Sequence, residues 1–189
     1  RPLSISWSAE HVLAILEAWF PGIQGGSAIA DVIFGDYNPG AKLPVTFPRT
    51  VGQVPIYYNH ENTGRPPSSD RWTSKYLDIP STPLFSFGHG LSYTKFGYSN
   101  LRINQKRIES GEEFEISADV KNIGDRKGDE IVQLYLRDVV ATVTRPVKEL
   151  KGFKRITLEP GEKKTVNFRL ASDELSFVDR DLKRVVEPG

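Results

Sequence analysis

The chain has 189 residues, of which 38% are hydrophobic and 26% charged, and it carries a net charge of +1. This composition is typical of a globular protein. The balanced charge gives no support for binding to nucleic acid or to an anionic membrane, because both require a cationic surface. The absence of cysteine excludes disulfides and thiolate chemistry. No apolar run approaches the ~18–20 residues of a membrane span.

Two features of the sequence concern its organisation. It begins at Arg1 and contains no methionine, so we interpret it as a piece of a longer polypeptide. Residues 1–95 hold 10 of the 13 prolines and 13 of the 20 aromatic residues, whereas residues 96–189 hold most of the charged ones. This shift in composition predicts a domain boundary near Lys95.

The first part of the chain predicts two helices. One is expected to begin at Ser6 or Ser8 and to end at Pro21, because apolar residues there recur with helical spacing. Its apolar stripe consists of Val12, Ile15, Leu16 and Trp19. A second, short helix is expected over residues 26–34. Two such helices do not close a core, so this part is expected to need more protein upstream.

A proline-rich segment follows, and its prolines are too frequent for regular structure. They are Pro44, Pro48, Pro55, Pro66, Pro67, Pro80 and Pro83. A loop of this length is usually functional or a linker. Its carboxylates and aromatic residues are typical of a sugar-binding rim or, equally, of a loop that packs on its own domain: Glu61, Asp70 and Asp78, with Tyr57, Tyr58, Trp72 and Tyr76. We expect residues 61–75 to be its exposed tip.

Residues 96–189 predict an antiparallel β-sandwich of immunoglobulin or fibronectin type III shape, because short segments of alternating apolar and polar residues are separated by turns. The predicted core consists of Phe114, Ile116, Val120, Leu134, Leu136, Phe153, Val166 and Phe168. A seven-stranded sandwich needs about 100 residues. Because this part is shorter and ends in a turn, its last strand is expected to be missing.

No catalytic or metal-binding constellation is complete in the sequence. The three histidines, His11, His60 and His89, lack metal-ligand spacing, so we expect no metal. Residues 21–27 are rich in glycine but lack the Lys-Ser/Thr of a phosphate loop and follow a helix, which favours a tight turn and no cofactor. No Gly-x-Ser-x-Gly nucleophile turn is present.

Three blocks of sequence closely resemble family 3 glycoside hydrolases, the β-glucosidase and β-xylosidase group. The first extends over residues 19–48, from WFPGIQGG through GDYNPGAKLPVTFP, and the others are FSFGHGLSYTKF at 85–96 and TRPVKELKGF at 144–153. The resemblance extends over essentially the whole chain. It implies a parent enzyme with an N-terminal barrel, an α/β sandwich domain and a C-terminal fibronectin type III-like domain.

The resemblance also implies how the chain is divided. Residues 1–49 correspond to the C-terminal end of the α/β sandwich domain. Residues 50–95 form a Pro-rich exit segment and linker. Residues 96–189 correspond to the fibronectin type III-like domain, without its last strand. The expected fold class is therefore an α/β fragment followed by an all-β antiparallel sandwich.

The family hydrolyses β-glycosides with retention, using an Asp nucleophile on the barrel and a Glu acid/base in the α/β domain. Neither maps onto a residue of this chain, so we carry over no catalytic residue. The resemblance implies an exo-acting parent, with β-glucosidase favoured, that acts on β-linked glucosides or related oligosaccharides and is periplasmic or secreted. The expected partners are the barrel and the rest of the α/β domain.

Three residues of the tip, Glu61, Arg65 and Trp72, are our candidates for lying near the substrate. In this interpretation the chain supports the active site without containing the catalytic pair. The alternative is a stand-alone β-sandwich module that binds carbohydrate or another protein.

Overall fold

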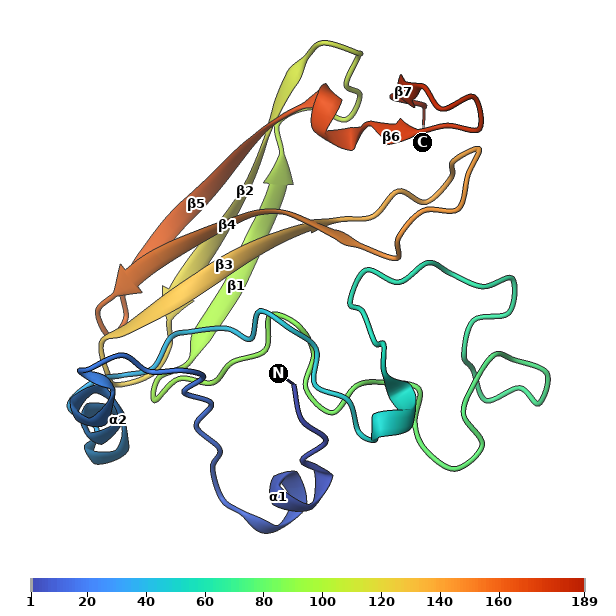
Figure 1. Ribbon diagram of the computed structural model, residues 1–189. Coiled ribbons are helices and arrows are strands. Elements are labelled where there is room, and N and C mark those ends of the chain that lie inside the picture. The colour runs from blue at the N-terminus through green and yellow to red at the C-terminus, as the bar shows by residue number, and fades with distance from the viewer. Residues whose placement is uncertain (1, 189) are drawn as a thin grey trace.

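The computed structural model describes residues 2–188 and divides into a strand-rich body and an irregular N-terminal part (Figure 1). Within these residues the elements, in chain order, are α1 (Ser6–His11), α2 (Gly25–Phe34), the 3₁₀ turn η1 (Val51–Gln53), β1 (Phe96–Ile103), β2 (Glu113–Asn122), β3 (Gly128–Leu136), β4 (Glu149–Leu158), β5 (Lys163–Ala171), the 3₁₀ turn η2 (Ser172–Leu175), β6 (Phe177–Val178) and β7 (Arg184–Val185).

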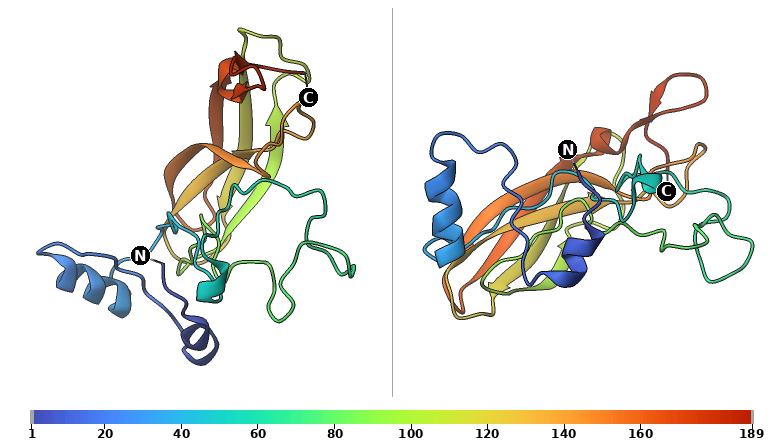
Figure 2. Two further views of the ribbon diagram at one scale, coloured as in Figure 1. Left: turned by 45° about the vertical axis from the view of Figure 1, so that its right-hand side comes forward. Right: turned by 60° about the horizontal axis from the view of Figure 1, so that its bottom comes forward.

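The strands form antiparallel sheets, as the sequence predicts. One sheet has the order β1-β2-β5, a second consists of β3 and β4, and β6 and β7 form a short hairpin. The two larger sheets lie face to face, which the turned views of Figure 2 also show. Two apolar clusters lie between them: Val120, Val132, Leu158, Val166 and Phe168 in one, and Phe114, Ile116 and Leu170 in the other.

One residue of the predicted core is wrong. Phe153 in β4 is 68% exposed, because its neighbour Gly152 faces the interior. A Cβ atom on Gly152 would lie 2.9 Å from the ring of Phe168. Since successive residues of a strand point to opposite faces, Phe153 must then point outward. The other predicted core residues are buried, apart from Leu134 and Leu136, which are partly buried against the clusters.

The first predicted helix is much shorter than expected. It ends at His11, and Val12 already has an extended backbone. None of the α1 residues is buried, and the apolar stripe that follows is exposed to solvent. Helix stability comes mainly from packing of an apolar face, and within residues 2–188 this face stays about 40–46% exposed, with Trp19 beside the Phe47 ring at 6.1 Å. By contrast, α2 agrees with the prediction and ends at Gly35, whose left-handed backbone (φ +86°) closes the helix.

The proline-rich segment is irregular apart from η1, as its prolines predict. Near its start, Phe47 is buried (2% exposed) and forms an isolated β-bridge with Phe85. In place of the hydrogen bonds of a helix or strand, the buried side chain of Gln53 links two backbone groups of this segment. It accepts a hydrogen bond from the Arg49 N–H (2.7 Å) and donates one to the Pro80 carbonyl (3.0 Å).

Residues 36–48 and 85–95 pack against one end of the β-sandwich. The Asn38 side-chain oxygen accepts a hydrogen bond from the Tyr93 N–H (2.8 Å), and its amide donates to the Lys127 carbonyl (2.9 Å). Glu130 of β3 accepts hydrogen bonds from the Lys42 ammonium (3.0 Å) and the Tyr98 hydroxyl (2.7 Å). Burial and the Glu130 carboxylate raise the pKa of Tyr98 well above its ordinary value.

Candidate functional site

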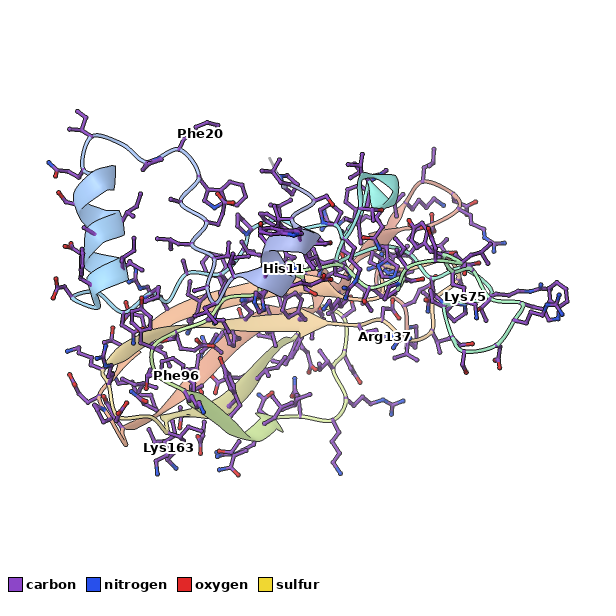
Figure 3. All side chains as sticks on the ribbon, turned by 90° about the horizontal axis from the view of Figure 1, so that it is seen from below. His11, Phe20, Lys75, Phe96, Arg137 and Lys163 are labelled. Atoms are coloured by element: carbon purple, nitrogen blue, oxygen red, sulfur yellow. The ribbon has the colours of Figure 1, made fainter. Side chains whose placement is uncertain are left out.

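The tip, residues 61–75, is a surface loop that closes on itself. All of its residues except Thr73 are exposed, as predicted. The Lys75 ammonium donates to three carbonyl oxygens of the same loop, those of Ser68 (3.1 Å), Ser69 (3.2 Å) and Asp70 (2.7 Å). Figure 3 shows Lys75 on this loop, well away from the helix α2. These bonds give the tip a defined shape although it contains no helix or strand.

Trp72 is the most prominent side chain of the tip. Its indole is 73% exposed, and the Arg71 guanidinium lies 5.1 Å from the ring centroid. Cation–π stacking of this kind restrains the ring. An exposed indole restrained in this way offers a flat apolar surface with one polar edge, which is suited to contact with a sugar ring.

The structure separates the three candidate residues along the loop. Glu61 lies at its base, where it forms an isolated β-bridge with Pro146 of the β-sandwich. Arg65 lies farther from the base of the loop, and its carbonyl accepts a hydrogen bond from the Ser74 N–H (2.9 Å). Within residues 2–188, no hydrogen bond or ion pair joins the side chains of Glu61, Arg65 and Trp72. They share one loop but do not form a preassembled cluster.

Tyr58 lies below the tip, against the β-sandwich. Its ring stacks on Phe87 with centroids 4.2 Å apart and meets the edge of Tyr135, of β3, at 5.9 Å. Its hydroxyl accepts a hydrogen bond from the Leu150 N–H (3.3 Å). The sequence leaves two roles open for Tyr58, a sugar-binding rim and packing of the loop on its own domain, and its contacts agree with the second. Its particular partners lie up to 92 positions away, and no local pattern indicates them.

A cavity of about 310 Å³ lies beside the base of the tip, lined by Asn62 and by residues 137–141 and 143–147. Arg145 forms part of its wall. The guanidinium lies between the carboxylates of Asp138 (3.3 Å) and Glu149 (3.1 Å) and over the ring of Phe177 (4.4 Å). Its charge is balanced by these partners, so the arrangement is suited to holding the surrounding loop in place.

The histidines have separate packing environments. The His11 ring stacks on Trp7 (4.7 Å), and the His89 ring stacks on Phe85 (5.3 Å). The third, His60, places Nδ1 3.1 Å from the Tyr57 carbonyl oxygen. Across residues 2–188 there is no group of three or more His, Asp or Glu side chains arranged to hold a metal ion. Neither helix of that part is long and apolar enough to span a bilayer.

Two family models match the chain in succession. Residues 1–93 match the glycosyl hydrolase family 3 C-terminal domain, and residues 130–189 match a fibronectin type III-like domain. The second match covers the strands from β3 onward, and the first covers the helices, the tip and the segment that returns to the β-sandwich.

Curated relatives match from one end of the chain to the other. A periplasmic beta-glucosidase of Salmonella typhimurium is 48% identical, with 100% of this chain and 25% of that protein covered. A beta-xylosidase of Formosa agariphila is 50% identical, with 100% and 26% covered. The chain thus spans about a quarter of the length of these relatives.

Solved structures agree with the sequence matches. The beta-glucosidase of Listeria innocua, in complex with glucose, is 46% identical with a TM-score of 0.94, and the match covers 100% of this chain and 27% of that one. Beta-glucosidase 3B of Thermotoga neapolitana is 29% identical with a TM-score of 0.74, covering 93% and 25%. The chain belongs to glycosyl hydrolase family 3, with residues 1–93 matching the family's C-terminal domain and residues 130–189 a fibronectin type III-like domain.

Proposed function

We propose that this chain is the C-terminal part of a retaining, exo-acting β-glycosidase, with β-glucosidase favoured over β-xylosidase, and that it supports the active site without supplying the catalytic pair. The observation that carries the proposal is the apolar surface of the N-terminal part. Leu13, Phe20, Ile23 and Phe34 are almost fully exposed. Figure 3 shows Phe20 pointing away from the rest of the protein.

A continuous polypeptide partner accounts for this surface. Large exposed apolar areas mark surfaces that are covered in the functional protein. Of the large hydrophobic residues between positions 2 and 95, Phe47 is the one that is buried, so this part has almost no core of its own. Since the relatives are about four times as long as the chain, we assign the cover to the remainder of the same polypeptide, the expected barrel and the rest of the α/β domain.

In this proposal the chemistry is done by two carboxyl groups of that remainder, about 5–5.5 Å apart as retention requires. The tip reaches toward the sugar-binding site from outside. Trp72 supplies a flat apolar surface, and Arg65 and Glu61 supply hydrogen-bonding groups for sugar hydroxyls. The substrates are β-linked glucosides or related oligosaccharides. A periplasmic or secreted location is supported by the name of the Salmonella relative.

A stand-alone carbohydrate- or protein-binding module is the second candidate, favoured by one observation. The β-sandwich has its own apolar clusters, drawn from β2, β3, β4 and β5. The exposed surface of residues 3–34 argues against it, because an independent module would not keep that surface in water.

The proposal is tested by comparing the 189-residue chain with the full-length enzyme on nitrophenyl β-glucoside and β-xyloside. We expect turnover by the full-length enzyme and none by the chain. Glu61→Gln and Asp78→Asn serve as controls, because a trace of host glycosidase would be unaffected by them. Turnover by the purified chain that disappears in either variant would overturn the proposal.

A further inference from the structure

The tip makes few connections to the rest of the protein. In the part of the chain that the structure describes, the hydrogen bonds of residues 63–75 stay within that loop. They include those of the Lys75 ammonium, the Ser74 N–H to the Arg65 carbonyl and the pairing of Ser68 with Asp70. The loop is therefore a self-contained unit whose orientation is set at its base.

The base is fixed to the β-sandwich by two kinds of contact, which we call the anchor. The backbone contact is the hydrogen bond from the Val147 N–H to the His60 carbonyl (2.9 Å), next to the Glu61–Pro146 bridge. The side-chain contact is Tyr58, described above. The anchor therefore consists of Tyr58, His60, Phe87, Tyr135, Val147 and Leu150.

Tyr58 is the central residue of the anchor because it joins three segments of chain. Its ring contacts Phe87, in the segment that leads to β1, and Tyr135 near the end of β3, while its hydroxyl accepts a hydrogen bond from the Leu150 N–H of β4. The Lys148 ammonium covers the Tyr135 ring at 5.1 Å and extends the stack by one layer. Loss of the ring would remove the aromatic contacts, whereas loss of the hydroxyl would remove one hydrogen bond.

We propose that Tyr58 is a positioning residue of the parent enzyme. Through the anchor, the β-sandwich holds the tip in the orientation in which Trp72 and Arg65 meet the sugar. This inference rests on the proposed function, in which the tip lies near the substrate. It gives the fibronectin type III-like domain a specific task, the placing of a distant loop, because small displacements of a binding group cost large factors in activity.

The experiment uses the full-length enzyme with three variants, Tyr58→Ala, Tyr58→Phe and, as a matched control, Tyr98→Ala. Tyr98 is another half-buried tyrosine of the β-sandwich, but its hydroxyl binds Glu130, away from the tip. Two quantities are measured: the rate of tryptic cleavage at Arg71 and Lys75, and KM and kcat for a β-linked disaccharide and for a nitrophenyl glucoside.

For Tyr58→Ala we expect faster cleavage and a KM for the disaccharide raised roughly tenfold, with kcat for the nitrophenyl glucoside changed by less than about twofold. Tyr58→Phe should restore most of the wild-type behaviour, because it keeps the stack. Tyr98→Ala should leave the cleavage rate and the KM unchanged.

The contrary outcomes are distinct. Unchanged cleavage and unchanged KM in Tyr58→Ala would overturn the anchor itself. Faster cleavage with an unchanged KM would show that the anchor holds the tip but that the tip does not meet the sugar, which overturns the positioning role and that element of the proposed function. An equal loss of kcat for all substrates that Tyr58→Phe does not restore would indicate a merely structural role and would also overturn it.

Discussion

At the scale of single residues, the best-satisfied charged group of the β-sandwich is Asp119 of β2. The residue is 3% exposed, and its carboxylate accepts hydrogen bonds from the Asn100 amide (2.8 Å), the Thr165 hydroxyl (2.7 Å) and the Lys163 ammonium (3.3 Å). These bonds, first that from Asn100 and then that from Thr165, lower the pKa of Asp119 from 3.8 to about 2. The ionised form is therefore the one that stabilises the fold.

This arrangement predicts the direction of a pH effect. Because the pKa is lower in the folded state, the stabilisation is fully present above about pH 4 and is lost as the pH falls toward 2. Asp119→Asn should lower the Tm at pH 7 by several degrees, and the difference from wild type should shrink between pH 4 and pH 2. Thermal unfolding followed by circular dichroism measures both. A difference that stays constant over this range would mean that the charge of Asp119 is not involved.

Substitution of two phenylalanines tests which side chains of β4 and β5 point into the core. Phe168 is buried in the core, whereas Phe153 is largely exposed. Phe168→Asp should unfold the β-sandwich, since burying an unpaired carboxylate costs several kcal/mol at least. Phe153→Asp introduces the same group at the surface and should leave the Tm of the chain almost unchanged. Similar losses of Tm in both variants would contradict the register of β4.

At the scale of elements, the β-strands could be predicted from the sequence and the first helix could not. Apolar and polar residues alternate along β2 and β5, which is the pattern of a strand with one buried and one exposed face. Both strands lie where this pattern predicts them. The apolar residues from Val12 to Trp19 indicate only that one side of this segment would be apolar if it formed a helix. Whether such a segment becomes a helix depends on what it packs against, and residues 2–188 leave the stripe largely exposed.

The candidate site was predictable to a similar degree. Prolines and charges correctly predict an exposed tip, because they act locally. The positions of Tyr58 and Glu61 at its base depend on pairing with residues near 146–150, and such long-range contacts leave no local mark. The outward direction of Phe153 was missed for a related reason, because Gly152 has no side chain that would reveal which way it faces.

The tip and the junction before β1 should differ in their susceptibility to protease. Trypsin should cut the chain first at Arg71 or Lys75, which lie in the exposed tip, while Arg65 is protected by the following Pro66. Lys95 should resist, because its carbonyl accepts a hydrogen bond from the Ile123 N–H (2.8 Å) and Thr94 beside it is buried. Mass spectrometry of the first fragments identifies the order. Early cleavage at Lys95 would mean that the N-terminal part is loosely attached to the β-sandwich.

At the scale of the whole molecule, the protein has two very different sides. The β-sandwich end is tightly joined to the segment that enters it. A Cβ atom on Gly40 would lie 2.6 Å from the Asp129 carbonyl oxygen, and the Tyr37 hydroxyl lies 2.7 Å from the Arg155 guanidinium. The N-terminal end, where α1, α2 and the segment between them lie outside the β-sandwich (Figure 2), exposes its apolar side chains. The close contacts of residues 37 and 40 fix this N-terminal end relative to the β-sandwich, so a domain bound there would be held in a defined orientation.

If the remainder of the enzyme covers this apolar end, one substitution should have a small effect on the 189-residue chain and a large effect on the full-length enzyme. Leu13 is fully exposed in the chain, so Leu13→Asp should change the Tm of the 189-residue protein little. In the full-length enzyme the same aspartate would be buried without a partner, which costs several kcal/mol at least, and the Tm should fall markedly. Leu101→Asp on β1, where the leucine is 73% exposed, is the matched control and should be mild in both proteins. Equal tolerance of Leu13→Asp in both would contradict burial of this surface, and the apolar end would then need a different partner.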